Sequence, residues 1–89
     1  MGYSRFYPGN VREVAFFWEA ADEATSYVLK VGTTTMQATG DTYDANVGNV
    51  LTESVLLVVG LTYYARAVVV GGAHDGELTA GGEQEVTVA

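Results

Sequence analysis

The chain has 89 residues and no cysteine, and its 11 acidic residues against four Lys and Arg give a formal net charge of −7. This length indicates one domain, and an apolar core has to stabilise it because neither disulfides nor thiolate metal sites are available. The acidic balance disfavours nucleic acid as a partner, since Lys and Arg supply the affinity for phosphate, and no run approaches the ~20 apolar residues of a membrane-spanning helix.

The apolar residues alternate with other residues and show no helical period, and 11 glycines punctuate the runs, so we predict an all-β fold. Residues 3–8 can supply only an edge strand, because Pro8 has no amide hydrogen. Residues 33–49 are mostly polar and are expected to hold one short edge strand from Thr42 to Ala45. Glycines frame a long flexible loop over residues 71–82. The positions expected to face the core are Val14, Phe16 and Trp18, then Tyr27, Leu29 and Val31, then Val55 and Leu57, then Tyr63, Ala65, Ala67 and Val69, and finally Val86 and Val88.

Leu57 precedes Tyr63 by six residues, and Tyr63 opens an alternating strand, which is the pattern of a tyrosine corner in Greek-key β-sandwiches. Trp18 lies upstream at an inward position, and Tyr27 is followed by alternating Leu29. Together these residues resemble a fibronectin type III domain over nearly the whole chain. The resemblance implies a single domain over residues 1–89, folded as a seven-stranded Greek-key β-sandwich.

The resemblance gives Trp18, Tyr27, Leu57 and Tyr63 structural roles. The Tyr63 hydroxyl is expected to find a backbone acceptor a few residues upstream, because an unpaired buried polar group costs roughly 1–3 kcal/mol. An alternating strand favours a core position for Trp18 over stacking on a ligand. The chain departs from the family pattern after Leu57: Val59 stands where proline is usual and Leu61 where threonine is usual, which predicts a less rigid corner loop.

Candidate catalytic groups are few. His74 is the only histidine, and a Ser-His-Asp triad would have to combine it with Asp75 and with Ser4, Ser26 or Ser54. A glycine-rich loop does not hold the imidazole between nucleophile and carboxylate, so we expect a solvated loop histidine. We therefore predict no enzyme, no catalytic residues and no cofactor.

Pairs of carboxylates are candidate metal ligands, and they occur at Asp22/Glu23, Asp41/Asp44 and Asp75/Glu77. A glycosidase needs two carboxylates across one cleft, which a sandwich of this size is not expected to form. The segment from Asp41 to Asp44 lacks the six or more converging oxygens of a calcium loop. We expect solvated loop charge and no metal site.

The outward positions are unusually apolar. Alternation places Val28, Lys30, Tyr64, Arg66, Val68 and Val70 on the outer face of one sheet, and Phe17, Leu56 and Val58 on the outer face of the other. Because large apolar patches on soluble monomers mark interaction sites, we predict partner binding through Val28, Tyr64, Arg66 and Val68, with Tyr64 and Arg66 as energetic anchors. The alternatives are a register displaced by one residue at Leu56 and Val58, or loops that cover one of the patches.

These observations favour a non-catalytic structural or adhesion module that contacts other protein subunits in a homo- or hetero-oligomer. Fibronectin-like modules occur on phage tails and capsids, so the resemblance implies a bacteriophage virion component. Residues 1–10 also lack the basic start and apolar block of a signal peptide, which for a complete gene product predicts no export by that route. The alternative is a spacer or ligand-binding module of a secreted bacterial protein. Loop 71–82 lacks the Arg-Gly-Asp tripeptide of adhesive relatives and stays a second candidate binding segment.

Overall fold

The computed structural model describes residues 10–35 and 41–89. Within these ranges there are six strands and no helix: β1 (Val11–Phe17), β2 (Ser26–Gly32), β3 (Tyr43–Gly48), β4 (Thr52–Val58), β5 (Thr62–Val70) and β6 (Gln84–Thr87). The described residues thus contain no helix long and apolar enough to cross a membrane.

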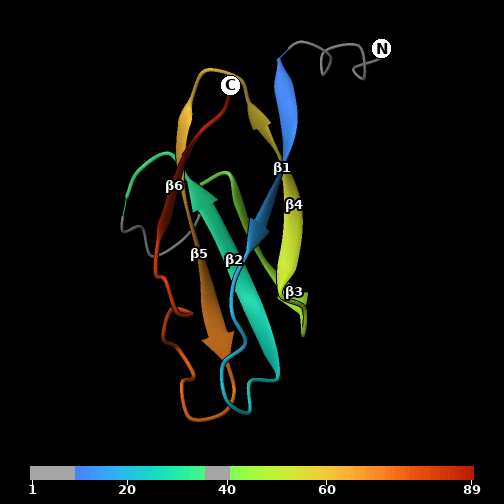
Figure 1. Ribbon diagram of the computed structural model, residues 1–89, viewed down its shortest axis with the longest axis vertical. Helices are drawn as coiled ribbons and strands as arrows, with labels where there is room; N and C mark the ends of the chain where they lie inside the picture. Colours follow the sequence, from blue (N-terminus) through green and yellow to red (C-terminus); the bar gives the residue numbers. More distant parts are fainter. Residues whose placement is uncertain (1–9, 36–40) are drawn as a thin grey trace.

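The strands form two antiparallel sheets, one of β1 and β4 and one in the order β3-β2-β5-β6 (Figure 1). This arrangement confirms the all-β class and a β-sandwich-like architecture. Six strands are found in the described residues instead of the seven predicted. The strand expected over residues 3–8 lies outside the described ranges, so the seventh strand and the Greek-key topology stay predictions.

The core lies between the two sheets and is built from the alternating positions of the strands. The buried apolar side chains are Phe16, Trp18, Tyr27, Leu29, Val31, Val55, Leu57, Tyr63, Ala65, Ala67, Val69 and Val88. Val14 and Val86 are partly buried and pack against them. The predicted facing of β1, β2, β4 and β5 is therefore confirmed. In particular Val55 and Leu57 are buried while Leu56 and Val58 are exposed, which excludes the one-residue shift of β4.

The aromatic residues of the core are tied to the backbone by hydrogen bonds. Tyr63 Oη accepts a hydrogen bond from the Val58 amide at 3.1 Å, so the corner forms, but its hydroxyl serves as an acceptor where we expected a donor. Trp18 Nε1 donates to the Val50 carbonyl at 2.9 Å, and its ring centroid lies 6.0 Å from that of Tyr27. These contacts fix the positions of the β3–β4 and β4–β5 connections relative to the core.

Two segments differ from the prediction. Strand β3 is longer than the expected Thr42 to Ala45, because Tyr43 and Val47 also pack against the core. The segment after β5 is not a free loop, since it continues along β5 by backbone hydrogen bonds. The Gly76 amide donates to the Val69 carbonyl at 2.7 Å, and the Thr79 amide donates to the Ala67 carbonyl at 3.0 Å.

Candidate functional site

The outer face of the two-stranded sheet is apolar and open. We call this surface the β1–β4 face, and it consists of Val11, Glu13, Ala15 and Phe17 of β1 and of Thr52, Ser54, Leu56 and Val58 of β4. The exposed fractions are 66% for Phe17, 55% for Leu56 and 43% for Val58. The antiparallel register sets Val11 opposite Val58, Glu13 opposite Leu56 and Phe17 opposite Thr52. Glu13 is therefore the single charged residue of this face.

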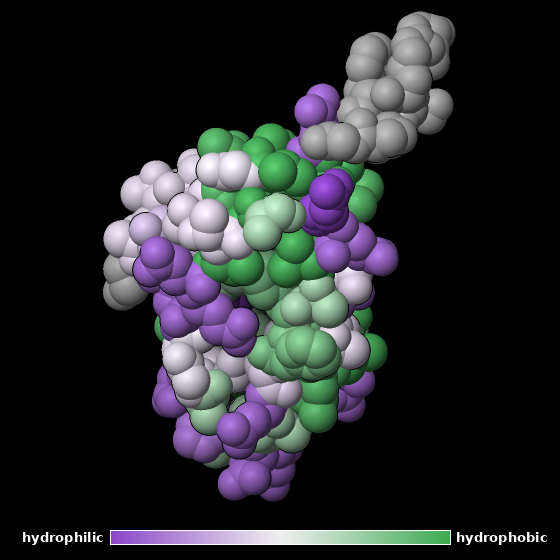
Figure 2. Space-filling view, turned by 45° about the horizontal axis from the view of Figure 1, so that its top comes forward, coloured by the Kyte–Doolittle hydropathy of each residue, from purple (hydrophilic) through white to green (hydrophobic). Residues whose placement is uncertain are grey.

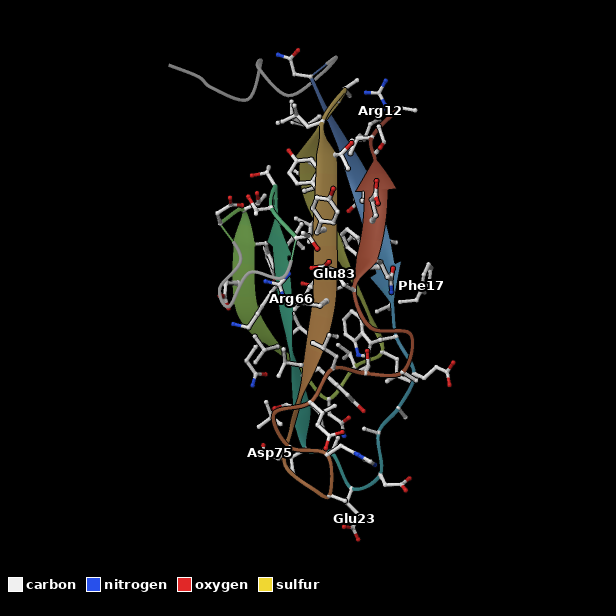
Figure 3. The ribbon with its side chains drawn as sticks, turned by 90° about the vertical axis from the view of Figure 1, so that its left-hand side faces the viewer. Arg12, Phe17, Glu23, Arg66, Asp75 and Glu83 are labelled. Carbon is white, nitrogen blue, oxygen red and sulfur yellow. The ribbon has the colours of Figure 1, made fainter. Side chains whose placement is uncertain are left out.

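The exposed apolar side chains of the β1–β4 face can be followed in the figures. Figure 2 shows apolar surface around the end of the molecule where β1 begins and β4 ends. Figure 3 shows the Phe17 side chain pointing away from the strands. The apolar character predicted for these outward positions is thus present at an accessible surface.

The outer face of the four-stranded sheet, named here the β2–β5 face, is less accessible. It carries the four residues that we predicted to bind a partner. Val28, Tyr64 and Val68 are half-buried, whereas Arg66 is only 5% exposed. The predicted exposure of Arg66 is therefore not found, and its role as a partner anchor stays a prediction.

Arg66 is buried because Glu83 covers it. Arg66 Nη1 lies 3.1 Å from Glu83 Oε2, and the two side chains meet over β5 (Figure 3). Thr35 Oγ1 donates to the other carboxylate oxygen of Glu83. Arg66 Nη2 has no hydrogen-bond partner within the described residues. The ion pair of Arg66 with Glu83 thus holds the segment before β6 against the sheet.

Sequence reasoning missed Glu83. The strand register places Gln84 opposite Ala65, which brings the preceding residue beside Arg66. A signal was present in the sequence, because an acidic residue directly precedes the last alternating run. Predicting that this residue pairs with Arg66 requires the β5–β6 register, which side-chain alternation alone does not provide.

The candidate catalytic residues are engaged in separate local contacts. His74 Nδ1 lies 3.1 Å from Glu77 Oε1, while Asp75 Oδ1 accepts from the Gly71 amide at 2.7 Å and closes the turn after β5. Ser26 Oγ accepts from the Asn46 amide group at 2.9 Å. Ser54 lies in β4, and Ser4 lies outside the described residues. No two of the triad candidates hydrogen-bond to one another within the described part of the chain.

Of the acidic pairs, Asp41 and Asp44 are likewise engaged in local contacts. Asp41 accepts from the Thr33 amide at 3.1 Å and from the Thr33 hydroxyl at 3.0 Å, and Asp44 pairs with Lys30 at 3.2 Å. Asp22 and Glu23 are exposed in the β1–β2 turn. Over residues 10–35 and 41–89, no group of three or more potential ligands converges on one point.

Burial and a contact with Glu53 shift the pKa of Tyr43. Tyr43 Oη donates to Glu53 Oε2 at 3.2 Å. Burial raises the pKa of the Tyr43 phenol, and the hydrogen bond to Glu53 and its charge raise that pKa further. All three effects favour the neutral phenol. The pair therefore links β3 to β4 and gives no sign of an activated acid or base.

The described residues enclose no pocket. Comparison of the chain with family models, with curated proteins and with solved structures finds no match.

Proposed function

We propose that this chain is a non-catalytic structural module, resembling fibronectin type III domains, that contacts other protein subunits in a larger assembly. The observation that carries the proposal is the exposure of Phe17, Leu56 and Val58 on one sheet face. Large apolar side chains gathered on an open face of a small domain are typical of surfaces that a partner protein covers. Removing such side chains from water contributes roughly 25 cal/mol per Å² of apolar area, and this gain has to exceed the entropy cost of association.

The β1–β4 face is the better contact of the two outer faces. A partner can cover Phe17 and Leu56 without any rearrangement of the domain. Recruiting Arg66 on the β2–β5 face would instead separate a buried guanidinium from Glu83, which is unfavourable unless the partner supplies a replacement carboxylate. We therefore propose the β1–β4 face as the principal contact and Val28, Tyr64 and Val68 as a secondary one.

The virion part of the proposal rests on the resemblance to the fibronectin-like modules of phage tails and capsids. The alternative, a spacer or ligand-binding module of a secreted multidomain protein, predicts that the β1–β4 face stays open in the functional state. The two proposals therefore differ in whether Phe17 and Leu56 are covered by another subunit.

Sedimentation of the chain in extracts of the cells that produce it tests the proposal. Wild-type chain should sediment in a complex much larger than its own 9.4 kDa. The double substitution Phe17→Ser with Leu56→Ser should release it as free folded chain, because it removes both apolar contacts without touching the core. The matched control is Leu78→Ser, which changes an exposed leucine beside Val68 of the secondary contact; this variant should stay in the complex because the principal contact is intact.

Wild-type chain that sediments as a free monomer in the extract would refute the assembly function and favour the spacer. Retention of the double variant in the complex would show that the contact lies elsewhere on the molecule. Circular dichroism of each variant establishes that the domain is still folded.

A further inference from the structure

Glu13 is the one carboxylate on the β1–β4 face, and it lies directly beside an exposed leucine. The register places Glu13 opposite Leu56. The Trp18 amide donates to the Leu51 carbonyl at 3.1 Å, and bonded pairs recur at every second position of an antiparallel ladder, so Glu13 and Leu56 form a non-hydrogen-bonded pair. Side chains of such pairs approach closely, with Cα atoms only about 4.5 Å apart. A surface that covers Leu56 therefore also removes water from the Glu13 carboxylate.

The Glu13 carboxylate has no counter-charge within the described residues. Glu13 is exposed, and it belongs to none of the ion pairs that these residues form with one another. Its neighbour Arg12 points to the other side of β1 and donates to the Val11 carbonyl at 3.1 Å. Lys30 and Arg66 are engaged in ion pairs on the other sheet. The described part of the chain thus supplies no cation to Glu13.

An unpaired carboxylate restricts what can cover this face. Covering it with apolar atoms is strongly unfavourable, because the charge loses its water and gains no counter-charge. A cation that pairs with the carboxylate offsets this loss. Arginine suits the position best, since its guanidinium is weakly hydrated and binds a carboxylate through two hydrogen bonds. A partner that covers Leu56 therefore needs a cationic side chain at Glu13.

The net charge of the chain favours the same class of partner. The formal charge of −7 attracts a basic surface and repels an acidic one, including a second copy of this chain. Complementary charge speeds the encounter of two proteins and suppresses contacts with like-charged surfaces. The local charge at Glu13 and the charge of the whole chain thus point to one kind of occupant.

We infer that the β1–β4 face binds a basic protein surface, which sets an arginine or lysine against Glu13 and apolar side chains against Phe17 and Leu56. The inference rests on the proposed function, because it states the chemistry of the partner that covers the same face. A purely apolar protein surface and a second copy of this chain are the competing occupants. Each of them predicts a different response to a change of charge.

Removing the Glu13 charge separates a basic partner from an apolar one. Serial dilution of the extract before sedimentation measures how tightly the complex holds the chain. Glu13→Gln should raise the concentration needed for retention at least about tenfold, because the partner's cation stays buried without its counter-charge. With a purely apolar partner the same substitution would strengthen retention, because a carboxylate no longer has to lose its water.

The matched control is Glu23→Gln. It removes the same charge from an exposed position in the β1–β2 turn, and Glu23 lies at the opposite end of the molecule from Arg12, the neighbour of Glu13 (Figure 3). This variant should be retained like the wild type. Circular dichroism of both variants establishes that the domain is folded.

Salt separates a basic partner from a second copy. Added NaCl should release wild-type chain, because it screens the attraction between an acidic domain and a basic surface. Two copies repel one another, so salt would instead hold them together more tightly. A complex that salt strengthens would overturn the inference, and so would a Glu13→Gln variant that is retained as well as the wild type.

The outcome for the inference is separable from that for the proposed function. If Phe17→Ser with Leu56→Ser releases the chain while Glu13→Gln does not, the β1–β4 face stands as the contact and only the basic partner is refuted. If neither variant is released, the contact lies elsewhere and the inference fails with it. Wild-type chain that sediments as a free monomer refutes both.

Discussion

At the scale of single residues, the adjacent tyrosines of β5 have different environments. Tyr63 is buried and accepts a hydrogen bond from the Val58 amide, whereas Tyr64 is half-buried on the opposite face and its hydroxyl makes no hydrogen bond within the described residues. We expect Tyr63→Phe to lower the free energy of unfolding by about 1–2 kcal/mol, because the Val58 amide loses the acceptor that the buried Tyr63 hydroxyl provides. Tyr64→Phe should change it by less than about 0.5 kcal/mol. Urea denaturation measures both, and equal effects would contradict this account of the corner.

The buried ion pair gives a second contrast. Glu83→Gln leaves the Arg66 guanidinium buried without its counter-charge, and we expect the free energy of unfolding to fall by about 2–3 kcal/mol. Asp44→Asn removes the partner of Lys30, whose pair is more exposed to solvent, and should cost less than about 1 kcal/mol. Thermal unfolding of the two variants measures the difference. A larger loss for Asp44→Asn would show that Glu83 does not hold the segment before β6.

At the scale of elements, the turn after β5 packs tightly against the β1–β2 turn. A Cβ at Gly72 would lie 2.5 Å from the Asp22 carbonyl oxygen, while a Cβ at Gly76 would meet nothing within 4 Å. Both glycines have positive φ, at 77° and 87°, so alanine is strained at either position by roughly 1–2 kcal/mol. Only Gly72→Ala adds a steric clash, so we expect it to lower the free energy of unfolding by a further 1–3 kcal/mol, roughly. Denaturation of the two alanine variants tests this, and equal losses would mean that the turns are not in contact.

Strand facing could be predicted from the sequence because each strand of the core buries one face. A register that buries one face is strongly specified, and the alternation of Phe16 and Trp18, or of Val55 and Leu57, displays it directly. The segment from Gly76 to Thr79 could not be predicted to follow β5. Its contacts with β5 are backbone hydrogen bonds, which leave no pattern in the side chains.

The candidate site likewise has features that alternation predicts and features that it does not predict. Outward exposure of Phe17, Leu56 and Val58 followed from alternation. The burial of Arg66 did not, because it depends on Glu83, which is distant in sequence and arrives through the β5–β6 pairing. Alternation tells which way a side chain points, but it does not tell what covers it.

At the scale of the whole molecule, the two sheets differ in what covers their outer faces. Glu83 covers Arg66 on the β2–β5 face through an ion pair, and Leu78 forms a β-bridge with Val68 beside β5. The β1–β4 face has no comparable cover among the described residues, and it exposes the apolar side chains of Phe17, Leu56 and Val58. This asymmetry is the physical basis for assigning the protein contact to the two-stranded sheet.

Amide hydrogen exchange of the assembled chain, compared with the isolated monomer, tests this assignment most directly. Exchange should slow in the assembled form at the Ser54 and Leu56 amides, because a partner that covers the β1–β4 face shields this sheet from water. Exchange at Val28, Tyr64 and Val68 should change less, because these residues form only the secondary contact. Protection confined to the β2–β5 face, with β4 unchanged, would contradict the account and return the contact to the other sheet.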